Sequence, residues 1–166
     1  MDYKRGMDGS EPKIAAICIS RKRGRRKKEV DSARLFPDWG IQGDAHSGRW
    51  KRQVSLLSAE SVEKMRQRGL DLAPGSFAEN ILTEGLDLQS LKIGDLIRIG
   101  EAELEITQIG KECHNRCSIY EQAGDCIMPR EGIFARVTRG GMIRKGDPLE
   151  VLRRVPRSAK NPVIEK

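Results

Sequence analysis

Aromatic side chains are scarce in this chain. Phe, Trp and Tyr together make up 4% of the residues, while hydrophobic residues of all kinds make up 37%, so the core must be mainly aliphatic. The scarcity also argues against nucleic-acid binding, because few rings are available to stack on bases and no recognisable nucleic-acid motif is present. We therefore expect any anionic partner to be a small phosphorylated molecule, with nucleic acid disfavoured.

Long apolar runs are missing as well. No stretch approaches the roughly 18 apolar residues that a membrane helix needs, and the N-terminus has no apolar segment of the signal-peptide type. We expect a cytoplasmic protein without a membrane partner. The length of 166 residues allows one domain. We place it at 13–152, with a disordered N-terminal segment at 1–12 and a disordered basic tail at 153–166.

Alternating or continuous apolar stretches, separated by turn glycines, predict about eight short strands. They cover 13–20, 29–36, 53–57, 77–83, 96–100, 102–109, 133–137 and 149–152. One helix is clear, from Glu60 to Arg68, with Ser58 as its N-cap and Gly69 after its end. This pattern predicts a mainly β fold, either a barrel or a sandwich. Cys18 lies inside the first strand, where it is expected to be a small core residue.

The positive charge is concentrated in one run. The net charge is +7, and the seven cations between positions 21 and 28 account for all of it. They are Arg21, Lys22, Arg23, Arg25, Arg26, Lys27 and Lys28. The run is either a solvated surface loop or a rim that attracts a phosphate or another anion, and a nucleic-acid-binding barrel is a third interpretation.

A glycine-rich turn carries the second candidate site. Asp44 and His46 follow Gly43, and Arg52 comes shortly after them. Successive loop N–H groups with cationic side chains nearby form a concavity suited to an anion. The alternative is an Asx-type turn made by Asp44, which His46 merely caps.

The predicted strand 77–83 contains Glu79 and Asn80 at its centre. Asparagine is depleted in strands. Asn80 is therefore expected at a bulge or a pocket wall, although a plain edge position is also allowed.

Three cysteines and a histidine lie between two predicted strands: Cys113, His114, Cys117 and Cys126. Without an export signal, thiol or metal chemistry is favoured over disulfides. In one interpretation Cys113 acts alone, as a thiolate whose pKa is lowered by neighbouring cations. In another, the set binds zinc or an iron–sulfur cluster as a non-catalytic adaptor, although the usual C-x2-C pair is missing. Cys117 and Cys126 could also simply pack in the core.

Several short motifs occur in a fixed order along the chain. They are 40–46 (GIQGDAH), 52–54 (RQV), 77–81 (FAENI), 91–95 (LKIGD), 108–113 (QIGKEC) and 132–137 (GIFARV). Each is weak alone, but the ordered set resembles the MOSC domain, which is found at the C-terminus of molybdenum-cofactor sulfurases and as short standalone bacterial proteins. The resemblance covers roughly 13–152.

The resemblance implies a closed β-barrel of the MOSC, pyruvate-kinase-like type with one or two short helices. It also implies binding of the molybdenum cofactor, a molybdopterin, and a cysteine that carries sulfur as a persulfide or ligates molybdenum. Cys113 falls at that position, although Ile-Gly-Lys-Glu-Cys replaces the Pro-Arg-x-Pro-Cys lead-in of many members.

By the same resemblance, the expected cofactor-binding residues are Asp44, His46, Arg52, Asn80 and Arg136. A sulfurtransferase-type or molybdenum-dependent activity would follow, with a cysteine desulfurase or a molybdoenzyme as protein partner. The chain shows no aminotransferase-like domain with a pyridoxal phosphate site, so we expect that it does not mobilise sulfur from cysteine by itself.

Overall fold

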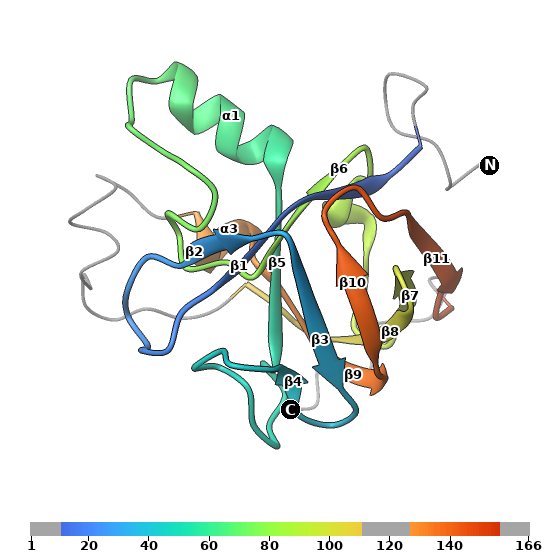
Figure 1. The fold of residues 1–166 in the computed structure, drawn as a ribbon. Coiled ribbons are helices and arrows are strands. Elements are labelled where there is room, and N and C mark those ends of the chain that lie inside the picture. The colour runs from blue at the N-terminus through green and yellow to red at the C-terminus, as the bar shows by residue number, and fades with distance from the viewer. Residues whose placement is uncertain (1–10, 111–126, 157–166) are drawn as a thin grey trace.

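The computed structural model describes residues 11–110 and 127–156, and its fold is mainly β (Figure 1). The larger sheet has eight strands in the order β11 (Leu149–Arg153), β7 (Leu96–Ile99), β8 (Ala102–Ile109), β9 (Ile133–Arg139), β5 (Val54–Ser58), β6 (Ile81–Glu84), β1 (Lys13–Ile19) and β2 (Lys28–Val30). The smaller sheet has the order β10 (Gly141–Arg144), β3 (Ser32–Phe36) and β4 (Gly40–Ile41). The helices are α1 (Ala59–Gln67), α3 (Met128–Glu131) and the short 3-10 helix η1 (Leu88–Ser90).

The strand pairing requires only one helical crossover connection. Every described strand pair is antiparallel except β5–β6, which is parallel. A parallel pair needs a crossover connection, and α1 follows β5 directly and supplies it. No helix in the described ranges is long and apolar enough to span a membrane.

The expectation of a closed barrel is not met by the described strands. The larger sheet ends at β11 and β2, and its return to β1 rests on one isolated bridge, Lys13–Pro148. Backbone hydrogen bonds from Ile14 N to Asp147 O and from Gly146 N to Ile14 O support the bridge. Pro148 has no N–H to donate to a ladder. The sheet therefore curls back on itself without a continuous ladder.

Two hydrophobic clusters fill the fold. The main core gathers aliphatic side chains from both sheets, including Ile17, Leu35 and Leu104. The second core packs α1 and α3 against the opposite face of the larger sheet, and it contains Cys18 and Phe134. The aliphatic core expected from the composition is confirmed, as is the burial of Cys18, whose exposure is 0%.

Most predicted elements are confirmed, and two need correction. The helix is confirmed with Ser58 as N-cap, because its side chain accepts a hydrogen bond from Ser61 N. The predicted strand 29–36 is two strands, β2 and β3, separated by Asp31. The predicted strand 77–83 begins only at Ile81. Residues 77–80 form an irregular segment because Ala78 adopts a φ of 62°, which is unfavourable for a strand.

Candidate functional site

A buried ion pair joins the basic run to the glycine-rich turn. Lys27 Nζ lies 2.7 Å from Asp44 Oδ1, and both side chains are fully buried. Asp44 also accepts hydrogen bonds from Ser20 N at 3.1 Å and from His46 N at 3.0 Å. A buried charge pair is tolerated when further hydrogen bonds satisfy its remaining atoms. The three donors around Asp44 meet that condition.

The ion pair also determines the orientation of His46. Lys27 Nζ lies 3.1 Å from His46 Nδ1. An ammonium group only donates hydrogen bonds, so Nδ1 acts as the acceptor, and in the neutral ring the proton resides on Nε2. The side chain of His46 is 27% exposed. It therefore presents a ring near the surface in one tautomer, held by a group that lies beneath it.

Trp50 connects this cluster to two arginines. Its indole Nε1 donates to His46 O at 2.8 Å, and its ring lies parallel to that of His46 with a centroid separation of 6.4 Å. The guanidinium of Arg23 lies 4.7 Å from the Trp50 ring centroid, and that of Arg52 lies 4.6 Å from it. Arg52 also lies 5.8 Å from the Phe134 ring. Cation–π contacts of this kind hold guanidinium groups against an aromatic ring, and Arg23 Nε also donates to Ala45 O at 3.3 Å.

The loop at residues 75–79 contacts the backbone of Lys27. Lys27 N donates to Gly75 O at 2.9 Å. Glu79 closes this loop, because its carboxylate accepts from Gly75 N at 2.6 Å and from Phe77 N at 3.0 Å. Burial raises the pKa of Glu79 to about 7, while these backbone hydrogen bonds and the charge of Lys27 act in the opposite direction. Burial is the dominant effect here because the side chain is almost wholly removed from water.

Cys18 is not a nucleophile in this arrangement. Burial raises the pKa of its thiol far above the usual range, and the nearby carboxylates Glu79 and Glu29 raise it further. The reactive form of cysteine is the thiolate, and the shift keeps Cys18 in the thiol form.

The structure brings three of the predicted site residues together. Asp44 and His46 share the Lys27 contact, and Arg52 joins them through Trp50. Asp44 accepts a hydrogen bond from the His46 backbone N–H and pairs with Lys27, which contacts the His46 ring.

Asn80 and Arg136 lie elsewhere. Asn80 is fully buried, and its side chain accepts from Ser55 N at 3.0 Å and donates to Cys18 O at 3.1 Å, so it ties β1 to β5. Arg136 on β9 pairs with Glu105 at 2.6 Å. The cofactor roles of both residues stay predictions. The structure does not describe the segment with the remaining candidates, Cys113, His114, Cys117 and Cys126. Their thiol, zinc or cluster roles stay predictions.

Three functional residues were not predicted as such. Lys27 is one of seven cations in the run, two others of which are also lysines, and only the fold selects it. Arg23 belongs to the same run, and its neighbour Trp50 could have been found from its place beside the Asp44–His46 turn. In the described part of the chain, no group of three or more His, Cys, Asp or Glu side chains is arranged to hold a metal ion. With His46 and the two arginines as donors, the cluster is suited to hold an anion.

Known proteins share this fold. The YuaD protein of Bacillus subtilis superposes with a TM-score of 0.69 at 22% identity, covering 84% of this chain and 94% of that one. YiiM of Escherichia coli superposes with a TM-score of 0.61 at 23% identity, covering 87% of this chain and 71% of that one. At this level of identity the likeness concerns the fold.

The sequence comparison agrees. Protein YiiM of Escherichia coli strain K12 is 26% identical over 146 residues, which cover 78% of this chain and 63% of that protein. The chain thus spans less than two thirds of the length of this curated relative. The model of the MOSC domain matches residues 43–150, well over half of the chain. The turn with Asp44 and His46 opens the matched region, and the chain belongs to the MOSC domain family.

Proposed function

We propose that this protein binds the molybdenum cofactor, with the anionic part of the pterin at the surface formed by His46, Trp50 and Arg52. The family is associated with this cofactor. The observation that carries the proposal is the buried Lys27–Asp44 pair beneath His46, because it leaves the His46 ring in the tautomer whose Nε2 can donate to an anionic oxygen. Arg52, held on the Trp50 ring, supplies a second donor with a positive charge.

Cys113 is the residue that we propose to carry sulfur, as a persulfide, or to ligate molybdenum. The described residues on both sides of its segment support this. Gly110 follows β8 and donates to Gly132 O at 2.7 Å. Ile127, on the other side, is buried in the second core with Phe134, the ring that Arg52 approaches. The segment that contains Cys113 therefore leaves and re-enters the described fold near the proposed cofactor surface.

The bound cofactor would supply a molybdenum centre, a soft metal that thiolates favour. The residues of this chain would bind and orient it: His46 and Arg52 by donating hydrogen bonds, and Lys27 and Asp44 by fixing His46. Glu105 engages Arg136, and Ser55 and Cys18 engage the Asn80 side chain, so the cofactor roles that the resemblance implies for these two residues stay predictions. A cysteine desulfurase or a molybdoenzyme would be the protein partner for sulfur transfer.

Reconstitution under anaerobic conditions tests both roles of Cys113. The protein is loaded with molybdenum cofactor, desalted and analysed for molybdenum and pterin. A second sample is treated with a sulfane-sulfur donor, either polysulfide or a cysteine desulfurase with cysteine, and examined by mass spectrometry. Cys113→Ser should lose molybdenum retention or the persulfide, while the matched changes Cys117→Ser and Cys126→Ser should keep both. Equal molybdenum retention in Cys113→Ser and wild type would reject the ligand role. The absence of a persulfide at Cys113 would reject the carrier role.

A matched pair of variants tests the anion-binding surface. His46→Gln and Arg52→Gln should each weaken cofactor retention about tenfold, the usual effect of removing a charge-assisted or buried ligand contact. Arg34→Gln changes an exposed arginine on β3 and should leave retention unchanged. About one zinc per chain in the purified protein, lost on changing Cys117 or Cys126, would instead support the zinc adaptor.

A further inference from the structure

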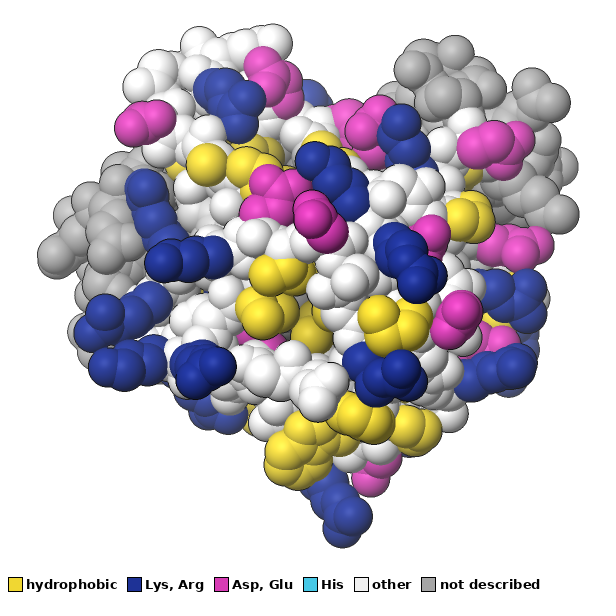
Figure 2. Space-filling view, viewed as in Figure 1, with side chains coloured by type: hydrophobic (Ala, Val, Ile, Leu, Met, Phe, Trp, Pro, Cys, Tyr) yellow, Lys and Arg dark blue, Asp and Glu magenta, His cyan; other side chains and the backbone are white. Residues whose placement is uncertain are grey.

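The turn of the β1–β2 hairpin carries the most concentrated charge on the molecule. Lys and Arg side chains gather on the left of the space-filling view, over this turn (Figure 2). Among the seven cations of the run, Lys27 is neutralised by Asp44 inside the protein. The other six line one hollow: Arg21, Lys22, Arg23, Arg25, Arg26 and Lys28.

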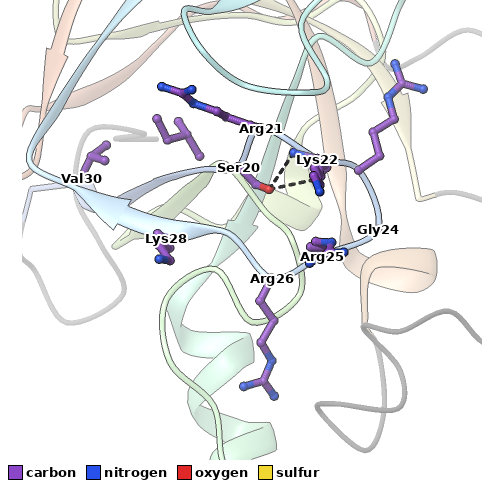
Figure 3. A pocket seen from close by; sticks show the side chains of 10 residues that line it. Ser20, Arg21, Lys22, Gly24, Arg25, Arg26, Lys28 and Val30 are labelled. Atoms are coloured by element: carbon purple, nitrogen blue, oxygen red, sulfur yellow. Dashed lines mark hydrogen bonds between the residues drawn. The ribbon is translucent and has the colours of Figure 1, made fainter.

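The hollow has a volume of about 1020 Å³, and no Asp or Glu is among its described lining residues. Strand register explains its composition. Ile17 and Ile19 of β1 lie opposite Val30 and Lys28 of β2, and side chains directly opposite each other in a ladder share a face of the sheet. Ile19 and Val30 supply an apolar part of the lining. Arg21 and Arg26 leave the loop in different directions (Figure 3), so the positive charge is spread around the turn.

Ion pairing is sparse at this hairpin. Elsewhere some cations pair with carboxylates, as in Lys13–Glu84, Arg98–Glu150 and Arg136–Glu105, while isolated exposed cations such as Arg34 and Arg144 form no ion pair with a described carboxylate. Four hairpin cations form no ion pair with a carboxylate of the described residues: Arg21, Lys22, Arg25 and Lys28. Even Glu29, adjacent to Lys28, pairs with Lys145 instead, at 3.1 Å. Clustered like charges repel one another, and an anion bound from outside the chain would relieve that repulsion.

We propose that this hollow, called here the hairpin site, binds small molecules that carry a diphosphate group, such as a nucleoside diphosphate. A phosphate monoester carries a charge of only about −1.5 to −2 at pH 7, whereas the four cations without a carboxylate partner among the described residues line a hollow large enough for a larger anion. A diphosphate matches that charge better, and Ile19 and Val30 offer an apolar surface to the attached ring system. A nucleic acid fits less well, because no aromatic ring is among the described lining residues to stack on bases.

The hairpin site is distinct from the proposed cofactor surface and does not depend on molybdenum. Arg23 lies between the two, since it lines the hollow and contacts the Trp50 ring. The intrinsic fluorescence of Trp50 should therefore report ligand binding at the hairpin site. Trp39→Phe leaves Trp50 as the only tryptophan in the chain.

Calorimetric titration of the full chain with ADP, AMP and inorganic pyrophosphate, at low salt and without divalent cations, tests the proposal. ADP should bind about tenfold or more tightly than AMP, because an added phosphate makes further charge-assisted hydrogen bonds. Arg21→Gln/Arg25→Gln should weaken ADP and pyrophosphate binding about tenfold or more. Both arginines are exposed and contact neither Asp44 nor Trp50, so the fold should be kept.

The matched control is Arg34→Gln/Arg144→Gln, which removes the same charge from exposed positions on the paired strands β3 and β10. It should change ADP affinity less than about twofold, the size of a long-range charge effect screened by salt. Equal affinity for ADP and AMP, or equal losses in the two double variants, would overturn the proposal. A single-stranded oligonucleotide that binds tighter than ADP with a steep salt dependence would overturn it in favour of nucleic acid. ADP binding that persists in Cys113→Ser would show that the hairpin site stands apart from the cofactor role.

Discussion

At the scale of single residues, Lys27 is the side chain that holds Asp44 and His46 in place. The sequence predicted Asp44 and His46 from their place in a glycine-rich turn, but it could not distinguish Lys27 from six other cations of the run. The selection is made by tertiary structure: Gly75 O accepts the Lys27 N–H, and the ammonium then reaches Asp44 and His46 inside the fold. A run of like charges thus contains one structural residue and several surface residues.

Lys27→Met should destabilise the protein by about 3–5 kcal/mol, because it leaves the Asp44 carboxylate buried without its partner. Lys27→Met/Asp44→Asn should recover part of this loss, since the amide oxygen of Asn remains an acceptor for Ser20 N. Urea unfolding measures the change in the free energy of unfolding. Nitrogen NMR of His46 gives a separate readout, because loss of the ammonium should allow the proton to populate Nδ1. Lys28→Met, at an exposed neighbour, should alter neither quantity.

Glu79 gives a pH dependence whose sign follows from its burial. Its pKa is about 7 in the folded protein, against 4.5 as the ordinary value. The folded state therefore binds a proton that the unfolded state has released between these two values, and the free energy of unfolding falls as pH rises through that window. The full effect is about 3 kcal/mol. Urea midpoints of wild type should fall between pH 4.5 and pH 7 relative to Glu79→Gln, and parallel pH profiles of the two proteins would contradict the assignment.

At the scale of elements, regular patterns were predictable and the segment around Glu79 was not. The helix after Ser58 follows from its cap, its spacing and Gly69, and the β7–β8 hairpin follows from alternating side chains around a turn. Residues 77–80 also look like part of an apolar strand. They instead wrap around a buried carboxylate, with Ala78 at positive φ. The decisive hydrogen bonds connect Glu79 to backbone groups, and hydrophobic periodicity carries no information about them.

Gly75 shows how closely this segment packs on the hairpin. Its φ is +89°, and a Cβ built on it would lie 2.0 Å from Lys27 O. Gly69 is the matched control, because its φ of +97° is similar and nothing lies within 4 Å of the corresponding Cβ position. Gly69→Ala should cost only the backbone strain, of about 1–2 kcal/mol. Gly75→Ala should cost about 2 kcal/mol more, because the Lys27 backbone must also move. Equal unfolding midpoints of the two variants in urea would show that the contact is unimportant.

At the scale of the whole molecule, the fold class was predictable and the closure of the sheet was not. The number of short apolar segments indicated a mainly β protein, and the ordered motifs indicated the family. Whether the sheet closes depends on contacts between distant ends of the chain, at residues 12–14 and 146–149. Pro148 and Gly146 mark this place in the sequence as an ordinary turn before a strand. Its contact with β1 is visible only in three dimensions.

That contact should behave as part of the cooperative core, because both of its sides carry buried residues of the main core. Ile14 is 1% exposed, and Leu149 is 3% exposed. The amide hydrogens of Ile14, Gly146 and Leu149 are all donated to backbone carbonyls across the junction. Opening the junction would expose the main core to water, so these amides should exchange only through global unfolding. Native-state hydrogen exchange should give them the same free energy of opening as Ala135 in the middle of β9. Markedly faster exchange at Gly146 and Leu149 than at Ala135 would mean that the sheet opens at this junction while its central strands stay paired.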